Sequence, residues 1–172
     1  MLQIFKYDPS FGDVYIKERE KIASLLEGGH SINHIGSTAI HGMDGKGVID
    51  IMVAFKTIAE IKSAVLLLKN EYFIDSDKIE RGDRIFMTSS DVESKPGDIH
   101  MHLVLDTSDG YLNAILFRDY LIKHTDIKQA YADLKYKLLG EVNGDRAEYT
   151  KKKSSFIKEV IALAKNESKI NC

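Results

Sequence analysis

The pattern of apolar and polar positions predicts short strands and helices over the first two thirds of the chain. Apolar residues three or four apart mark helices, and short apolar runs bounded by turn-forming residues mark strands. The expected helices cover residues 12–27 and 57–69. The expected strands, four or five in number, cover residues 31–35, 48–55, 72–75, 84–89 and 99–105. The strand at 48–55 is apolar on both faces except at Asp50, which is typical of a strand inside a sheet.

The last third of the chain is predicted to be helical. Three stretches with helical spacing of apolar residues are separated by Thr125, an expected helix cap, and by an Asn143-Gly144 turn. Strands followed by a group of helices are typical of an α+β domain. We therefore expect a small mixed sheet of four to five strands with a C-terminal group of about three helices. Residues 1–165 are expected to form this single domain, and the polar residues 166–172 are expected to fray.

Length, charge and cysteine content limit the possible classes of protein. A chain of 172 residues fits one domain with its own core. Its 24 basic and 26 acidic residues nearly balance, which argues against a general nucleic-acid-binding surface. The single cysteine, Cys172, excludes an internal disulfide framework. No apolar run reaches the ~18 residues of a membrane span, and the first residues lack a signal peptide's apolar core, so we expect a cytoplasmic protein without membrane contact.

Candidate chemistry is densest between residues 34 and 53. An apolar segment ends in a Gly36-Ser37 turn, and a glycine-rich loop then leads into the strand that carries Asp50. Glycine lets a phosphate approach the backbone, whose N–H groups attract anions. The alternative is an ordinary strand-to-helix turn with Ser37 or Thr38 as the cap. Because an unpaired carboxylate is costly to bury, Asp50 needs a metal, a basic partner or several N–H donors.

Two histidines extend this candidate site. His100 and His102 lie two residues apart in the strand expected at 99–105, so their side chains point to the same face. If that strand neighbours the strand of Asp50, two imidazoles and one carboxylate converge, a ligand set that accepts zinc, manganese, nickel or iron. The alternative is a pair of half-buried histidines that hydrogen-bond to their neighbours or bind a phosphate.

The basic residues near these segments have alternative interpretations. Lys46 and Arg118 are candidate phosphate ligands, since arginine grips a phosphate with two parallel hydrogen bonds and lysine offers a point charge. Alternatively, Lys46 or Arg84 forms an ion pair with Asp50, and Arg118 anchors its helix to the sheet through a salt bridge. His34, beside the turn, either binds a ligand or caps the end of its strand.

The remaining basic and aromatic residues are predicted to be structural. The lysines at 151–153, together with Lys135 and Lys137, are expected to form a solvated surface, because helical spacing spreads consecutive lysines over different sides. Three tyrosines at helical spacing are expected in the core rather than in a base-stacking platform: Tyr120, Tyr131 and Tyr149.

Several segments of the chain resemble the GrpB family, in order and over most of its length. The segments are residues 7–15, 34–39 (HIGSTA), 46–51 (KGVIDI), 100–104 (HMHLV), 117–121 (FRDYL), 131–135 (YADLK) and 149–153 (YTKKK). That family is similar to the nucleotidyltransferase superfamily with the polymerase-β-type fold. The resemblance therefore implies a nucleotidyltransferase-like topology and a nucleotide or other phosphorylated small molecule as the partner.

The resemblance also implies roles for individual residues. The expected nucleotide- and phosphate-binding residues are Gly36, Ser37, Thr38, Lys46 and Arg118. Asp50 is the expected catalytic residue, and with His100 and His102 it is expected to hold a divalent ion, which would be Mg²⁺, Mn²⁺, Zn²⁺ or Ni²⁺.

The chain departs from the implied pattern at one position that matters for catalysis. A second carboxylate would stand two residues after Asp50, on the same strand face, but the residue there is Met52. A two-metal site needs several oxygen ligands. Two hypotheses therefore follow. One is metal-dependent nucleotidyl transfer from a nucleoside triphosphate to an unknown acceptor, and the other is a catalytically inactive module that binds a nucleotide or phosphorylated ligand.

Overall fold

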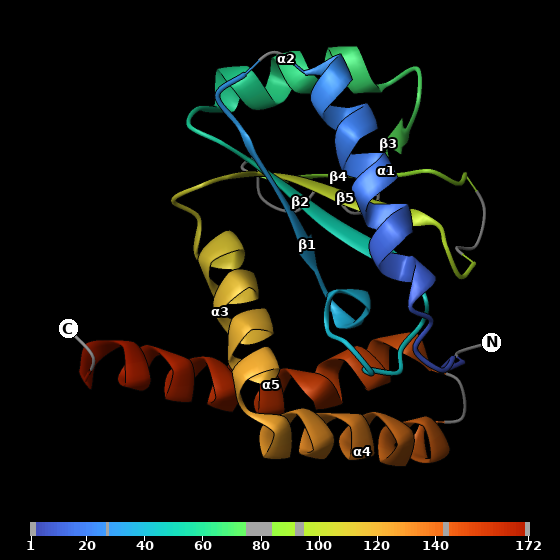
Figure 1. Cartoon of the computed structure of the whole chain (residues 1–172), viewed down its shortest axis with the longest axis vertical. Helices are drawn as coiled ribbons and strands as arrows, with labels where there is room; N and C mark the ends of the chain where they lie inside the picture. The colour runs from blue at the N-terminus through green and yellow to red at the C-terminus, as the bar shows by residue number, and fades with distance from the viewer. Residues whose placement is uncertain (1–2, 27, 75–83, 92–94, 143–144, 171–172) are drawn as a thin grey trace.

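The computed structural model describes residues 3–26, 28–74, 84–91, 95–142 and 145–170, and it confirms an α+β architecture (Figure 1). The helices are α1 (Ser10–Leu25), α2 (Ile58–Leu68), α3 (Asp109–Lys123), α4 (Thr125–Glu141) and α5 (Arg146–Ile170), with a short 3₁₀ turn, η1 (Ser37–Ala39). The strands are β1 (Ser31–Ile35), β2 (Ile49–Phe55), β3 (Phe73–Ile74), β4 (Arg84–Thr88) and β5 (Ile99–Leu105).

The five strands form one mixed sheet in the order β1-β2-β5-β4-β3. β2 and β5 run parallel, and the other neighbouring pairs are antiparallel. The prediction that the strand of Asp50 lies inside the sheet is confirmed, because β2 has a neighbour on each side. In the parallel pair Asp50 lies opposite His100, so the sheet itself brings these two residues together.

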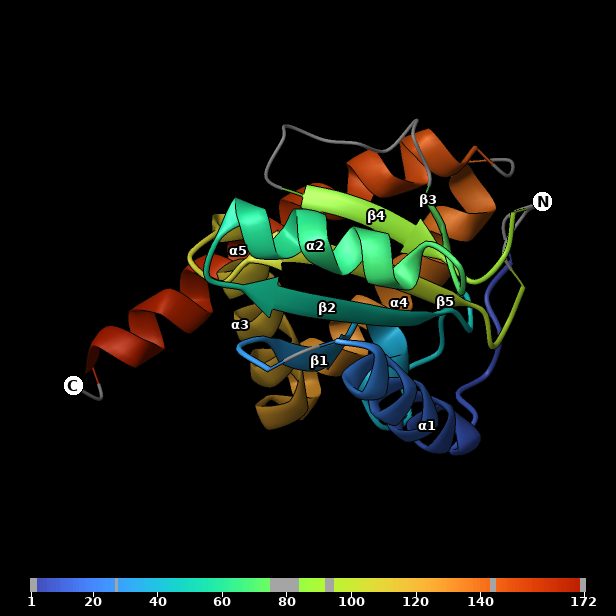
Figure 2. The same ribbon diagram turned by 90° about the horizontal axis from the view of Figure 1, so that it is seen from above.

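The two faces of the sheet have different partners. Alternate residues of β2 and β5, among them Ile51, Val53, Met101 and Leu103, form the main core with α1 and α2. Figures 1 and 2 show these two helices on the same face of the sheet, while α3, α4 and α5 lie on the other side. Since side chains alternate along a strand, Asp50 points to the side of α3, α4 and α5.

The loop from η1 to β2 joins the sheet to the helical group. Ile40 and Met43 of this loop are almost fully buried in a second core cluster with Leu121, Tyr131 and Val160 of the helices. Asp44 adds polar anchors, because its carboxylate accepts hydrogen bonds from Tyr136 of α4, at 2.6 Å, and from the ammonium of Lys6, at 2.9 Å. The loop is therefore held by the helical group at one end and by the sheet at the other.

Most element boundaries agree with the expectations from the sequence. The capping box of Thr57 and Glu60 is present at the start of α2. The tail is different, because α5 continues to Ile170 and the described residues of 166–172 are helical. Part of the strand expected at 72–75 and the turn expected at Asn143-Gly144 lie outside the described residues.

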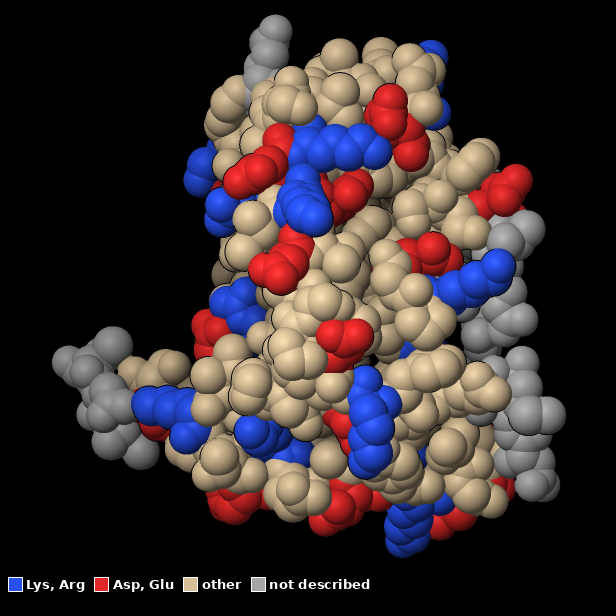
Figure 3. All heavy atoms as spheres, turned by 45° about the vertical axis from the view of Figure 1, so that its right-hand side comes forward, with Lys and Arg blue, Asp and Glu red and all other residues tan. Residues whose placement is uncertain are grey.

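Two surface properties bear on the expected partners. No helix in the described ranges is both long and apolar enough to cross a bilayer. On the face shown in Figure 3, acidic and basic side chains are interspersed, in line with the near balance of charge in the sequence.

Candidate functional site

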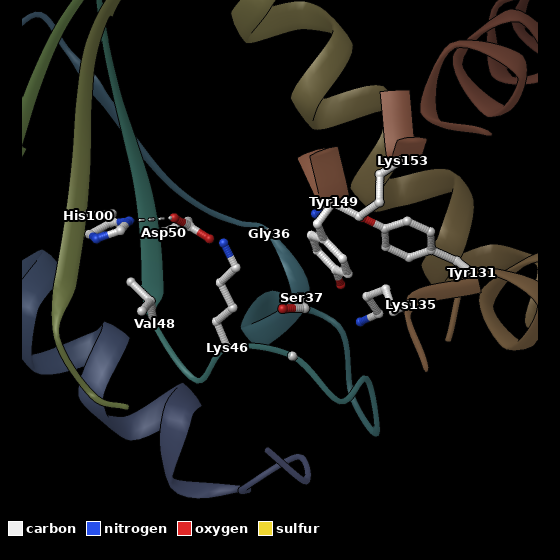
Figure 4. Close-up of a pocket in the computed structure, with 11 residues that line it drawn as sticks. Gly36, Ser37, Lys46, Val48, Asp50, His100, Tyr131, Lys135, Tyr149 and Lys153 are labelled. Carbon is white, nitrogen blue, oxygen red and sulfur yellow. Dashed lines mark ion pairs between the residues drawn. The ribbon is translucent and has the colours of Figure 1, made fainter. Parts of the chain in front are cut away.

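A pocket of about 200 Å³ opens between the sheet and the helical group, next to the loop that joins them (Figure 4). Its sheet side carries Gly36, Ser37, Lys46, Asp50 and His100. Its helix side carries Tyr131 and Lys135 of α4 and Tyr149 and Lys153 of α5. The structure therefore gathers five of the predicted site residues and adds four from the helices.

The Gly36-Ser37 turn is packed against the carboxylate. Gly36 has φ 71° and ψ −170°, a backbone conformation open essentially to glycine alone. A Cβ atom at Gly36 would lie 2.4 Å from Oδ2 of Asp50. Ser37 is packed just as closely against Gly45, because a Cβ atom at Gly45 would lie 2.1 Å from Oγ of Ser37. Both glycines thus allow the close approach on which the shape of the pocket depends.

Asp50 and His100 form a pair that faces the pocket. Oδ1 of Asp50 lies 3.6 Å from Nδ1 of His100, and the two side chains retain 31% and 23% of their exposure. His102 lies on the same face of β5, but its Nδ1 lies 2.8 Å from a guanidinium nitrogen of Arg84, and its ring packs against Phe86. Within the described residues, no three His, Cys, Asp or Glu side chains gather as a metal site. The structure thus joins His100, and not His102, to Asp50.

Lys135 and Lys153 were expected on a solvated surface, and this expectation is wrong for both. Lys135 is only 3% exposed, and its ammonium donates to the backbone carbonyl of Asp44. Lys153 is half-buried, and its ammonium lies 4.7 Å from the centre of the Tyr149 ring. The reason is that α4 and α5 pack with the faces that carry these lysines toward the pocket.

The electrostatics of the pocket are dominated by these lysines. Burial lowers the pKa of Lys135 to about 8, with the positive charge of Lys153 acting in the same direction. Burial likewise lowers the pKa of Lys153 to about 8, assisted by Lys46 and opposed by Asp50. Three mutually repelling ammonium groups thus share one pocket with a single carboxylate. An anion in the pocket would relieve this repulsion.

Comparison with known sequences decides the family. The sequence model of the family described as GrpB protein matches residues 1–163, nearly the whole chain. This chain belongs to the GrpB family. A UPF0157 protein of Vibrio cholerae is 32% identical over 95% of this chain and 84% of its own length. The glutamate-rich protein GrpB of Alkalihalophilus pseudofirmus is 27% identical over 86% of this chain and 87% of its own length.

One solved structure of a GrpB protein has the same fold as this chain. The crystal structure of the conserved protein GrpB from Enterococcus faecalis superimposes with a TM-score of 0.82 at 20% identity, covering 96% of this chain and 99% of that chain. The Cid1 poly(U) polymerase, in a structure described as Mg 3′-dATP bound, matches with a TM-score of 0.45 at 11% identity, over 84% of this chain and 48% of that chain. The first of these matches supports the fold class inferred from the sequence.

Three of the candidate residues named from the sequence do not line the pocket. Each of them forms structural contacts instead. Arg118 donates to the backbone carbonyl of His34, at 2.8 Å, and pairs with Asp119, at 2.7 Å, so it anchors α3 to β1. Thr38 is buried and donates to the carbonyl of Val48, at 3.1 Å. His34 stacks on Tyr15 of α1, on the opposite face of the sheet.

In this GrpB chain, the spacing of residues along α4 and α5 is enough to indicate which lysines face the core. Tyr131 and Lys135 are four residues apart on α4, and Tyr149 and Lys153 are four apart on α5. Side chains four apart lie on the same face of a helix. A lysine one turn beyond a core tyrosine is therefore directed to the same side as the core. Applied to both helices, this rule would have placed the two lysines on the inner face.

His34 provides a prediction on acid stability. Burial, with Arg118 acting in the same direction and Asp50 opposing, lowers the pKa of His34 to about 4. Between pH 6.5 and 4 the unfolded chain therefore binds a proton that the folded chain does not, and stability falls as the pH falls through this window. We expect His34 to contribute a loss of about 1–2 kcal/mol between pH 7 and 4.5.

Urea unfolding of the wild type and of His34→Gln at both pH values measures this contribution. The glutamine variant keeps a hydrogen-bonding group beside Thr38 but cannot titrate, so its stability should depend less on pH. The same carboxylates titrate in both proteins, and their effects cancel in the difference. An identical pH dependence in the two proteins would contradict the assignment.

Proposed function

We propose that this GrpB protein binds a nucleotide or another phosphorylated small molecule in the pocket beside Asp50. The observation that carries the proposal is the convergence of Lys46, Lys135 and Lys153 on one cavity that also contains the Gly36-Ser37 turn. Buried cations need a partner of opposite charge, and Asp50 is the one carboxylate among the residues that line this pocket. A phosphate supplies both negative charge and several acceptor oxygens.

The turn and Lys46 supply the phosphate contacts on the sheet side. Ser37 offers its hydroxyl group to a ligand in the pocket, and Gly36 before it allows the ligand to approach the backbone. Lys46 extends from the loop along the wall that carries Asp50 (Figure 4). In the proposed complex Lys46 neutralises a phosphate and limits the repulsion between that phosphate and Asp50.

A divalent ion is compatible with the donors present, provided that the ligand completes its coordination. Asp50 and His100 offer one carboxylate and one imidazole, and Mg²⁺ is commonly held by one or two carboxylates together with substrate phosphates. An ion held there would withdraw charge from a bound phosphate and make it more reactive. Imidazole in the donor set favours Mn²⁺, Zn²⁺ or Ni²⁺ over Mg²⁺.

Two versions of the proposal differ in turnover. In the first, Asp50 is catalytic, and the protein transfers a nucleotidyl group from a nucleoside triphosphate to an acceptor by holding the phosphates in position. In the second, the same pocket binds its ligand without reaction. The second version is favoured by Met52, which is 3% exposed and stands where a further carboxylate would be needed.

A thermal-shift screen tests the proposal. We expect nucleoside triphosphates with Mg²⁺, Mn²⁺, Zn²⁺ or Ni²⁺ to stabilise the wild type by about 2.7 kcal/mol at a hundred times Kd, a rise in Tm of roughly 5–10 °C. Asp50→Asn should lose the part of the shift that requires the metal. Asp13→Asn, which removes an exposed carboxylate of α1, is the matched control and should respond like the wild type.

The same samples separate binding from catalysis. With candidate hydroxyl- and amine-bearing acceptors added to take the nucleotidyl group, release of pyrophosphate that is lost in Asp50→Asn would support transferase activity, whereas a thermal shift without pyrophosphate release for any acceptor would support the binding module. If no triphosphate or metal at about 10 mM changes the Tm of the wild type, the proposed function is wrong.

A further inference from the structure

The helical side of the pocket carries two lysines to which the phosphate contacts proposed on the sheet side give no role. Lys135 and Lys153 come from two different helices and reach the same cavity, facing Lys46 and Asp50 across it. Burying an ammonium group is costly, so two such groups in one small cavity call for a ligand. Each lies over a tyrosine ring of its own helix, Lys135 at 5.1 Å from the centre of Tyr131 and Lys153 at 4.7 Å from that of Tyr149.

We propose that Lys135 and Lys153 form a second phosphate subsite opposite Lys46, so that the pocket holds two linked phosphates between the sheet and the helical group. The inference rests on the proposed function, since it specifies which phosphorylated ligands this pocket accepts. The ligand class is a diphosphate: inorganic pyrophosphate or the linked phosphates of a nucleoside di- or triphosphate.

Charge favours two phosphates over one. With all three lysines protonated, the residues lining the pocket carry three positive charges against the one negative charge of Asp50. A single phosphate reaches only one of the two walls. Two linked phosphates place negative charge at both walls, where each lysine can form a charge-assisted hydrogen bond.

Volume favours the same class. The pocket of about 200 Å³ has room for roughly six or seven water molecules at about 30 Å³ each. Pockets that enclose a drug-sized ligand occupy roughly 300–1,000 Å³. A pocket of this size has room for a diphosphate, and in a nucleotide the nucleoside would lie at its mouth.

Binding in this subsite takes up protons. Lys135 faces the carbonyl of Asp44, the Tyr131 ring and Lys153, while Lys153 faces Lys46, Asp50 and Tyr149. Because burial holds the pKa of both lysines at about 8, each is partly neutral in the free protein near that pH. A phosphate beside them favours the charged form and raises both pKa values. The complex then binds protons that the free protein does not.

Isothermal titration of the wild type with phosphate, pyrophosphate and ADP tests the subsite. At pH 8 we expect pyrophosphate and ADP each to bind at least tenfold more tightly than phosphate. Titrations in two buffers with different ionisation enthalpies measure the protons taken up. Lys153→Met should weaken pyrophosphate binding at least tenfold and reduce proton uptake, whereas any protons contributed by the ligand itself are common to both proteins and cancel.

Two further variants keep the test decisive. Lys151→Met removes an exposed lysine of the same helix and should bind pyrophosphate like the wild type. Lys135→Met repeats the test from α4, in case Lys153→Met proves unstable. If pyrophosphate binds no better than phosphate, or if both pocket variants bind it like the wild type, the subsite is overturned while the proposed function stands. If no phosphate-bearing compound binds to the wild type, both are overturned.

Discussion

Gly36→Ala is expected to destabilise the protein by about 3–5 kcal/mol and to abolish ligand binding. Gly36 has φ 71° and ψ −170°, and forcing a side chain into such a conformation costs roughly 1–3 kcal/mol. The added methyl group would also lie 2.4 Å from Oδ2 of Asp50, an overlap that adds a similar cost. The carboxylate would have to move out of the position in which it faces the pocket.

Thermal unfolding and titration with pyrophosphate check both parts of this expectation. The predicted loss corresponds to a fall in Tm of roughly 8–15 °C. Gly12→Ala is the matched control, because Gly12 lies in α1 with no atom within 4 Å of a Cβ placed there. That change should be neutral or stabilising by up to about 1 kcal/mol. A Gly36→Ala variant with unchanged Tm and affinity would show that the turn is not packed against Asp50.

Lys153→Met is expected to raise stability and to lower affinity at the same time. Without ligand, the charged lysine is repelled by Lys46 and is poorly solvated, so its removal should stabilise the protein by about 1–2 kcal/mol at pH 7. Methionine keeps an unbranched apolar chain to pack beside Tyr149. Loss of a charge-assisted hydrogen bond to the ligand costs about 1.5–3 kcal/mol, which is roughly a 10- to 150-fold loss of affinity.

The stabilisation expected for Lys153→Met depends on pH, because Lys153 has different pKa values in the folded and unfolded chains. The pKa of Lys153 is about 8 in the folded protein and 10.5 as its ordinary value, so the folded chain releases its proton first. The cost of the buried charge is therefore complete below pH 8 and disappears as the pH rises toward 10.5. The stabilisation of Lys153→Met should shrink over the same window. Lys151→Met should change stability by less than about 0.5 kcal/mol. A destabilised Lys153→Met variant would contradict the prediction.

The fold was largely predictable because its strands carry strong local patterns. The strands at 31–35 and 99–105 have the predicted bounds, since alternation and bounding turns are properties of the segments themselves. The pairing of Asp50 with His100 followed once the two strands were taken as neighbours, because register then decides which side chains meet.

The helical half of the site was less predictable because it depends on how distant elements dock. Spacing from Tyr131 and Tyr149 puts Lys135 and Lys153 on the inner faces of their helices, but whether such a lysine meets water or a cavity is decided by the helix–sheet packing. For Arg118 the sequence left two interpretations open, a phosphate ligand and an anchor of its helix to the sheet. Its guanidinium is held by the carbonyl of His34 at the edge of the sheet.

The order of the two walls along the chain has a consequence for protein synthesis. Gly36, Asp50 and His100 belong to the part of the chain made first, whereas α5, which carries Lys153, begins only at Arg146. At about 5–20 residues per second, Asp50 and His100 are synthesised seconds before α5. A nascent chain that ends before α5 would thus contain Asp50, Lys46 and Lys135 but lack Lys153. The proposed two-phosphate site would be complete only once α5 has been synthesised.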